Sequence, residues 1–212
     1  VPDGPGGALL GTPSGAFAAT GPSAVVSEQG AGLSDRWVTA VAVDGAEAPH
    51  SRVGDELRIE SPLVAGESVS VAVSYEGSPD PVDDLGDGWR TGWLRNAEGT
   101  FVASEPGGAR TWFPGNDHPT DKATFTFRIT APEGMTAVAN GELADTIATD
   151  GGSTFVWEMA DPMATYLATV VVAPLERIDY PSVGGVVLRD YLPPDFGGTP
   201  PDSFTKIGAM ID

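Results

Sequence analysis

The sequence of 212 residues contains no cysteine and only two histidines, His50 and His118. A catalytic zinc site takes its ligands mostly from Cys and His, and it needs three of them with a fourth position left open. The two histidines do not form the H-E-x-x-H pair that many zinc peptidases use. We therefore expect this chain by itself to bind no metal and to have no metal-dependent activity. Without cysteine, the fold does not depend on disulfides, which suits a cytosolic protein and a secreted one equally.

Basic residues are also few, because 11 Lys and Arg stand against 30 Asp and Glu, a net charge of -19 at pH 7. Nucleic acids and anionic membranes are bound through basic patches, so neither is expected as a partner. The longest apolar run, Tyr166–Pro174, is far shorter than the ~20 residues of a membrane span. The first residues, Val1–Gly4, carry none of the features of a signal peptide. Cytoplasmic and secreted locations both stay open.

Glycine and proline are abundant, at 28 and 19 residues, while the apolar content is 41%. Many short strands joined by Gly and Pro turns account for both numbers, and no helical period separates the strands. We therefore predict an all-β fold, a large antiparallel β-sandwich or saddle-shaped domain. The length also accommodates two smaller β domains.

The clearest strand is Ser68–Tyr75, in which Val and Tyr alternate with small polar residues. This period of two predicts a strand with one buried face. Turn signals at Asp44-Gly45 and Asp150-Gly151 predict hairpins. Other strands are predicted around Trp37–Val43, Leu57–Ile59, Phe125–Ile129, Phe155–Met159 and Val186–Tyr191, and Leu167–Val172 reads as a fully buried strand.

The two ends of the chain differ from this pattern. Residues 1–30 are rich in Gly, Ala, Ser and Pro and predict an arm or a loose edge strand. Residues 31–201 are predicted to form the β domain. In residues 202–212, Phe204, Ile207 and Ile211 recur at helical spacing after a capping Asp202 or Ser203. A helix of ~10 residues is marginal alone, so we expect a truncated helix that leads to a further, absent domain.

The segment from Glu105 to Phe125, EPGGARTWFPGNDHPTDKATF, has too particular an order of turn residues, charges and aromatics for a generic loop. It contains every fixed position of the pattern E-P-x-x-A-R-x-x-F-P-x-x-D-x-P-x-x-K-A-x-F. In this it resembles the N-terminal domain of the aminopeptidase N family, which are gluzincin zinc metallopeptidases. A patchier likeness extends from about residue 33 to the end. Residues 1–30 match poorly, and a cysteine that often follows Phe-Pro is Gly115 here.

The resemblance implies a parent enzyme that removes N-terminal residues from peptides by means of zinc-activated water. In the family the zinc ligands belong to a helical catalytic domain, so zinc and catalysis are expected there, and this chain is expected to be inactive alone. The implied partners are that absent catalytic domain and the N-terminus of a peptide substrate. This chain would supply part of the cleft wall and one substrate anchor.

Glu105 is the implied anchor. It occupies the position of the family's glutamate, sometimes glutamine, that reaches into the cleft and helps hold the free α-amino group of the substrate. A carboxylate suits this task because it forms a charge-assisted hydrogen bond with an ammonium group. We interpret a second set of residues as shaping the loop that presents Glu105, through a small ion-pair network and through prolines that fix φ. These residues are Arg110, Pro114, Asp117, Pro119 and Lys122.

Three further features of the sequence are interpreted as structural. His118 has no nucleophile at a recognisable spacing and is expected to be a hydrogen-bonding loop residue. The acidic run from Asp80 to Asp87 lacks the spacing of a calcium loop and predicts a solvated loop. The neighbours Trp112 and Phe113 would face opposite sides of a strand, one toward the core and the other toward a cleft or domain interface.

Two other functions are compatible with the residues alone. One is an Ig-like, carbohydrate-binding or protein-binding β-sandwich module of a secreted acidic protein. The other is a stand-alone scaffold that retains the fold but never had a catalytic half. A gene that continues past Asp212 and encodes H-E-x-x-H would decide for the aminopeptidase.

Overall fold

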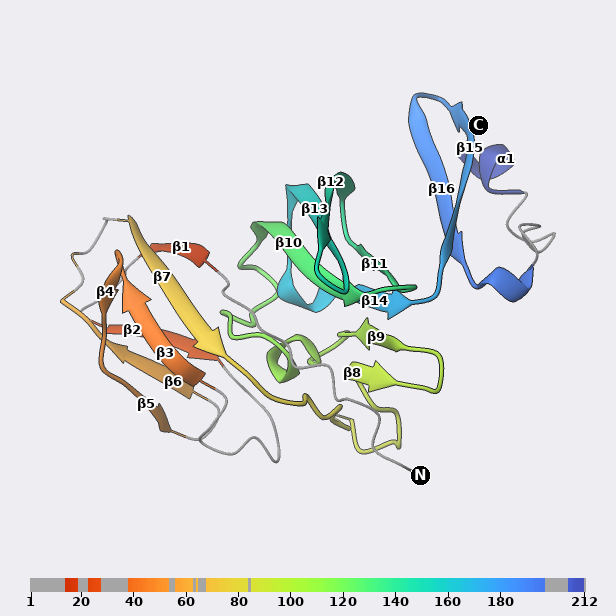
Figure 1. Ribbon diagram of the computed structural model, residues 1–212. Coiled ribbons are helices and arrows are strands. Elements are labelled where there is room, and N and C mark those ends of the chain that lie inside the picture. Colours follow the sequence, from red (N-terminus) through yellow and green to blue (C-terminus); the bar gives the residue numbers. More distant parts are fainter. Residues whose placement is uncertain are drawn as a thin grey trace. The chain divides into compact units, whose positions relative to one another are not determined.

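The computed structural model describes residues 14–18, 23–27, 38–53, 56–62, 64, 68–83, 85–196 and 206–211. These residues form two compact units (Figure 1). The first contains the described parts of Val1–Leu94, Val102–Ala123 and Pro162–Ala168, and the second those of Arg95–Phe101, Thr124–Asp161 and Thr169–Asp212. The predicted boundaries near residues 30 and 201 lie outside the described residues and stay predictions.

Two antiparallel sheets build the first unit. One has the strand order β1-β7-β3-β4 and the other the order β2-β6-β5. Their strands are β1 Ser14–Ala18, β2 Ser23–Ser27, β3 Val38–Val43, β4 Ala46–Glu47, β5 His50–Val53, β6 Glu56–Glu60 and β7 Ser68–Tyr75. The strands β1 and β2, both within residues 1–30, lie at sheet edges; the prediction of an arm or loose edge strand over this whole region stays a prediction.

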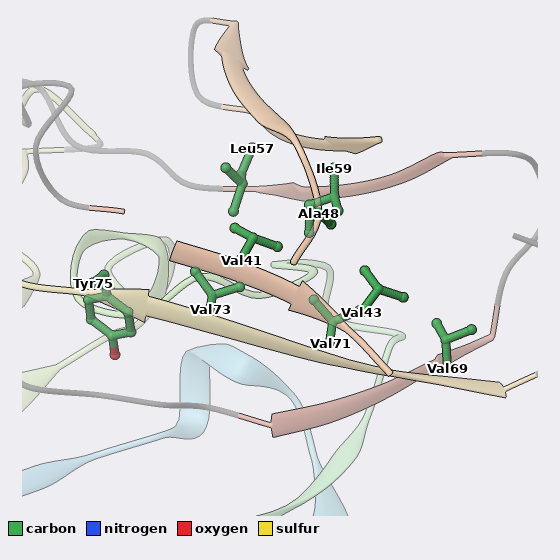
Figure 2. Packing of buried hydrophobic residues seen from close by; sticks show 9 residues of the cluster. All are labelled: Val41, Val43, Ala48, Leu57, Ile59, Val69, Val71, Val73 and Tyr75. Carbon is green, nitrogen blue, oxygen red and sulfur yellow. The ribbon is translucent and has the colours of Figure 1, made fainter. Parts of the chain in front are cut away.

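The core of the first unit lies between these sheets (Figure 2). Strand β7 buries its Val and Tyr side chains and exposes or half-buries the alternating polar ones, as the period of two predicts. Val41 on β3 faces Leu57 and Ile59 on β6, and all three are at most 2% exposed. Each such side chain contributes roughly 1.5–3 kcal/mol to folding by its burial.

The turn predicted at Asp44-Gly45 joins β3 to β4. Asp44 has φ 50° and Gly45 has φ 80°, the positive angles of a type I′ hairpin turn. The Asp44 N–H donates to the Ser70 carbonyl at 2.8 Å, and the Asp44 carboxylate accepts from the Ser70 N–H at 2.8 Å. The turn therefore also fixes the register of β3 on β7.

The second unit is also built from antiparallel strands. Its sheet β10-β13-β12 comprises β10 Ala123–Pro132, β12 Glu142–Thr149 and β13 Gly152–Met163. The strands β11 Thr136–Ala139 and β14 Val170–Ala173 also belong to this unit. They occur in the strand order β11-β14-β9-β8, in which β8 Gly92–Arg95 and β9 Thr100–Ala103 are each divided between the two units along the chain. A hairpin of β15 Glu176–Val183 and β16 Val186–Leu192 is followed by the 3₁₀ turn η3 Pro194–Phe196, and the described chain ends with α1 Ile207–Ile211. The prediction of an all-β fold with a short C-terminal helix is confirmed.

Trp157 on β13 is the central side chain of the second unit, at 1% exposure. Its indole N–H donates to the Ala137 carbonyl at 3.0 Å. The guanidinium carbon of Arg189 lies 5.5 Å from the ring centroid, and the Tyr191 ring stands edge-on at 5.9 Å. These contacts join β11, β13 and β16, so one residue holds three strands together.

The prediction of a fully buried strand over Leu167–Val172 is wrong at its start and in its burial, because within β14 only Val170 is buried while Val171 and Val172 are half-buried. Leu167 was placed in a fully buried strand by its apolar surroundings, but it ends the 3₁₀ turn η2 Thr165–Leu167 and is 46% exposed. The strand begins only at Val170, where β14 pairs with β11 and β9. An apolar run does not by itself distinguish a buried strand from a turn that packs on one side only. Of the predicted helix, Ile207 and Ile211 lie in α1, and Phe204 lies outside the described residues.

A hollow of about 510 Å³ lies in the second unit, beside the β15–β16 hairpin and α1. Its lining includes Glu142, Tyr180, Arg189, Asp190 and Ile207, and none of the predicted site residues. The Tyr180 hydroxyl donates to the Asp190 carboxylate at 2.6 Å. This hydrogen bond, with the negative charge of Asp190, favours the neutral phenol and raises the pKa of Tyr180 to about 12.

The raised pKa of Tyr180 predicts a stability change at alkaline pH. Because the folded-state pKa lies above the ordinary value of 10.0, the contribution is complete below that value and is lost as pH rises through about 12. In an ultraviolet titration compared with Tyr180→Phe, Asp190→Asn should bring the Tyr180 ionisation back toward its ordinary range. An unchanged titration in Asp190→Asn would contradict the assignment.

Candidate functional site

Glu105 lies at the start of a tight turn in the first unit, two residues after the end of strand β9 at Ala103. Its side chain is exposed, and it makes no hydrogen bond or ion pair with any residue that the structure describes. The turn closes between Ser104 and Gly108, where the Gly108 N–H donates to the Ser104 carbonyl at 2.6 Å. The backbone that carries Glu105 is therefore closed on itself while the carboxylate is left accessible.

Ser104 fixes the turn from its N-terminal side. Its side chain is 4% exposed, and its hydroxyl donates to the Ala168 carbonyl at 3.1 Å. The same oxygen accepts a hydrogen bond from the indole N–H of Trp112 at 3.2 Å. Trp112 in turn packs against the Trp93 ring with a centroid distance of 5.9 Å. Three separate parts of the chain thus hold the residue that precedes Glu105.

Gly108 fixes the turn from its C-terminal side through direct contact with Gly92 at the start of β8. A Cβ atom built on Gly108 would lie 2.3 Å from the Gly92 nitrogen, so the two backbones touch. Gly92 has φ 105°, and a Cβ there would lie 2.2 Å from the Thr111 hydroxyl. Since only glycine lacks the Cβ, both positions require it. The hydroxyl of Thr111 completes the contact by donating to the Gly108 carbonyl at 2.7 Å.

The second half of the segment Glu105–Phe125, which we call the signature loop, is held in place by η2. The Thr165 hydroxyl donates to the Asp117 carboxylate at 2.5 Å, and Asn116 donates through its amide to Asp121 at 2.6 Å. Gly115 lies against Phe113 and Thr165, with a hypothetical Cβ 3.3 Å from the Phe113 ring. Asp117 therefore has a neutral partner from a distant segment, where the sequence favoured an ion pair within the loop.

The remaining residues of the predicted set differ in burial. Arg110 is half-buried on η1 Ala109–Thr111, Pro114 is buried, and Pro119 and Lys122 are exposed. Their loop-shaping role, and that of Asp117, stays a prediction. The structure places all five in the same unit as Glu105.

The sequence-based prediction for Trp112 and Phe113 is wrong in its premise, because no strand contains them. They follow η1, and their rings contact each other edge-on at 4.6 Å. Trp112 is buried at 7% exposure, and Phe113 packs half-buried against the core of the first unit. Both rings therefore pack within the first unit and help to hold the signature loop in place.

His118 and the acidic run match their structural interpretation. The Nδ1 atom of His118 is 2.8 Å from the Thr120 hydroxyl, a hydrogen bond within the loop. In the acidic run, the Asp83 carboxylate accepts from the N–H groups of Gly86 and Gly88 at 2.7 and 3.0 Å. Within the described ranges, no three His, Asp or Glu side chains are grouped so that they could hold a metal ion. No helix in the described part of the chain is long and apolar enough to cross a bilayer.

Comparison with known proteins identifies the family. Residues 58–167 match the family model of the peptidase M1 N-terminal domain. The whole segment Glu105–Phe125 lies within the matched residues. The chain belongs to the peptidase M1 family. The likeness to aminopeptidases that the signature segment indicated is confirmed.

Two curated relatives are similar over half of the chain. Aminopeptidase A of Gloydius brevicauda is 32% identical over 110 residues, which are 50% of this chain and 12% of that protein. Glutamyl aminopeptidase of Homo sapiens is 32% identical over 111 residues, again 50% of this chain and 12% of that protein. The matched region is thus a small part of these relatives.

Solved structures extend the likeness to nearly the whole chain. A mutant of an M1 zinc metallopeptidase from Deinococcus radiodurans is 29% identical, with a TM-score of 0.80, over 96% of this chain and 47% of that one. A second structure, of a mutant two-domain M1 zinc metallopeptidase bound to L-arginine, has the same identity and TM-score. The match covers 96% of this chain and 48% of that one. The chain therefore spans about half the length of these structures.

Sequence reasoning missed the residues that hold Glu105 in place. Gly92, Ser104 and Thr165 lie up to 60 positions from it in the chain, and each acts through contacts that only the fold creates. A local pattern at Gly92 could have been noticed, since a glycine at the first position of a strand often marks close approach of another backbone.

Proposed function

We propose that this chain is the N-terminal domain of a zinc aminopeptidase and that Glu105 binds the free α-amino group of the peptide substrate. The observation that supports this most is an exposed carboxylate, without a partner in the described chain, on a turn fixed at both ends. A fixed turn matters because a binding group contributes most when its position is set before the ligand arrives. The bound ligands of the relatives agree, since one structure of the Deinococcus radiodurans enzyme is described as holding a Tyr-Ser-Ala substrate.

The chemistry assigned to this chain is binding and orientation. Zinc, when bound by the catalytic domain, would activate the attacking water. This chain, with two histidines and no cysteine, does not supply that ligand set. Glu105 would accept hydrogen bonds from the substrate ammonium and thereby set how far the first peptide bond extends into the cleft. Such an anchor favours exopeptidase activity, because an acylated or internal nitrogen lacks the positive charge and the additional N–H donors of a free α-amino group.

Of the two alternatives left open by the residues, the unrelated binding module loses its support, because the family match covers residues 58–167. A stand-alone scaffold of the same fold differs from our proposal in one respect. It would need no substrate anchor, so substitution of Glu105 would have no effect on any peptide reaction.

Glu105→Ala tests the proposal in the intact enzyme that contains this domain. Loss of a charge-assisted hydrogen bond in a partly buried site costs roughly 1.5–3 kcal/mol, which lowers kcat/KM by about one to two orders of magnitude. Discrimination between free and N-acetylated substrates should fall together with kcat/KM, because the anchor recognises the charge. Steady-state kinetics with paired free and acetylated peptides measures both.

Two matched variants complete the experiment. Glu133→Ala removes another exposed turn glutamate next to a proline, in the second unit, and should leave both quantities unchanged. Glu105→Gln keeps the shape and an acceptor oxygen but removes the charge, and should retain part of the efficiency. If Glu105→Ala behaves like Glu133→Ala, Glu105 is an ordinary solvated acid and the proposal fails.

A further inference from the structure

Two large apolar side chains in the first unit, Leu85 and Trp89, are exposed. Trp89 is 78% exposed and Leu85 is 68% exposed. Both lie in the described residues 81–83 and 85–91, which we call the Trp89 loop. The other described tryptophans, Trp93, Trp112 and Trp157, are at most 7% exposed. A tryptophan carries a large apolar area that folding normally buries at least in part. Its exposure points to a partner that covers it.

The Trp89 loop is held in shape by its own hydrogen bonds. Val82 and Thr91 exchange backbone hydrogen bonds at 2.9 and 2.8 Å at its base. Arg90 donates from its guanidinium to the Pro81 carbonyl at 2.7 Å. The Asp87 carboxylate accepts from the N–H of Trp89 at 3.0 Å, beside the two bonds to Asp83. Because the loop is already ordered, it loses little conformational entropy when a partner binds, which favours its use as a docking surface.

This loop leads directly into the backbone contact that fixes Glu105. Gly92 follows Thr91, and it is the residue against which Gly108 packs, three positions after Glu105. Trp89 and Glu105 are thus each three residues from a shared contact point within the first unit. The Trp89 loop and the Glu105 turn are therefore joined through one backbone contact in the same unit.

We infer that the Trp89 loop is the surface on which the catalytic domain of the same enzyme docks, with Trp89 inserted as its anchor. The inference rests on the proposed function. The relatives supply the occupant, because a structure described as two-domain is matched over 96% of this chain and only 48% of its own. The other domain of that structure, which this chain does not match, is the candidate that would cover Trp89. Asp80, Asp83 and Asp87 are exposed acids close to the apolar pair in the chain, so the facing surface should combine an apolar hollow with basic groups at its rim.

Hydroxyl-radical labelling of the intact wild-type enzyme tests the docking directly. We expect Trp89 to be oxidised at least about tenfold more slowly than in the unfolded protein, a protection close to that of the buried Trp93 and Trp112, since a docked anchor is as buried as a core residue. Labelling of Trp89 at nearly the unfolded rate would overturn the inference. So would protection that vanishes on dilution, which indicates a second copy, or protection that requires substrate, which indicates a cleft residue.

Substitution then separates docking from substrate binding. Trp89→Ala should lower the melting temperature of the intact enzyme by about 4–8 °C and reduce kcat/KM equally for all substrates, with discrimination against acetylated peptides unchanged. Trp89→Phe should restore most of the melting temperature. Val53→Ala, at a 49% exposed site on β5, is the control and should change neither quantity.

The two hypotheses fail in different ways. If Glu105→Ala has no effect on kinetics while Trp89 stays protected, the anchor assignment is wrong and the docking surface stands. If Trp89→Ala keeps the wild-type melting temperature and Trp89 is labelled freely, the docking surface is wrong whatever Glu105 does.

Discussion

Gly108→Ala should destabilise the fold by about 3 kcal/mol, the upper part of the range for overpacking a tight contact. Gly108 has φ -76° and ψ -15°, angles that alanine adopts freely, so backbone strain contributes nothing. The cost is steric. A Cβ would lie 2.3 Å from the Gly92 nitrogen, 2.8 Å from its Cα and 2.9 Å from the Thr91 carbonyl carbon. All three are backbone atoms that cannot rotate away, so β8 and the Glu105 turn must separate. Urea unfolding followed by circular dichroism measures the loss.

Gly88→Ala is the matched control for this prediction. Gly88 has φ 88° with nothing within 4 Å of a built Cβ, so alanine there meets only the conformational cost of a positive φ, about 1–2 kcal/mol. Because Gly108 also positions Glu105, Gly108→Ala in the intact enzyme should weaken discrimination between free and acetylated N-termini, whereas Gly88→Ala should not. A loss of stability in Gly108→Ala no larger than that in Gly88→Ala would show that the backbone contact is readily relaxed.

The strands that the sequence predicts best are those whose signal is local. The alternation in Ser68–Tyr75 is strict, and β7 has those bounds and that buried face. The hairpin turns at Asp44-Gly45 and Asp150-Gly151 carry residues that tolerate positive φ, and both turns form. Local period and turn chemistry decide these elements because neighbouring residues alone determine them.

Elements that depend on distant contacts could not be predicted in the same way. Leu167 lies in an apolar run, but Thr165 is bonded to Asp117, 48 positions earlier, and the chain forms the turn η2 where a strand was expected. Trp112 likewise lies after the 3₁₀ turn η1 and not in a strand, and its indole N–H forms a hydrogen bond with the Ser104 hydroxyl. Glu105 itself was found from its motif, while the contacts that hold its turn belong to Gly92 and Ala168. Its role as an anchor is still a prediction.

The second unit offers one side chain whose loss should have a comparable effect on stability. Trp157 is 1% exposed and links β11, β13 and β16 through the Ala137 carbonyl, Arg189 and Tyr191. Arg189 also donates to the Gly141 carbonyl at 2.5 Å, which keeps its guanidinium over the indole ring. Removal of the indole would therefore leave a cavity and take away one member from each of these contacts.

Trp157→Ala should cost about 3–5 kcal/mol, the range for truncating a buried Trp or Phe. Trp157→Phe keeps most of the apolar volume but loses the hydrogen bond to Ala137, and should cost about 1–3 kcal/mol. Trp89→Ala removes the same kind of side chain from a 78% exposed site, and in the 212-residue chain it should change stability by less than about 0.5 kcal/mol. Urea unfolding of the three variants, followed by circular dichroism because the changes remove fluorescent residues, should give this order. If Trp157→Ala loses no more stability than Trp89→Ala, the second unit is not held together by its central tryptophan.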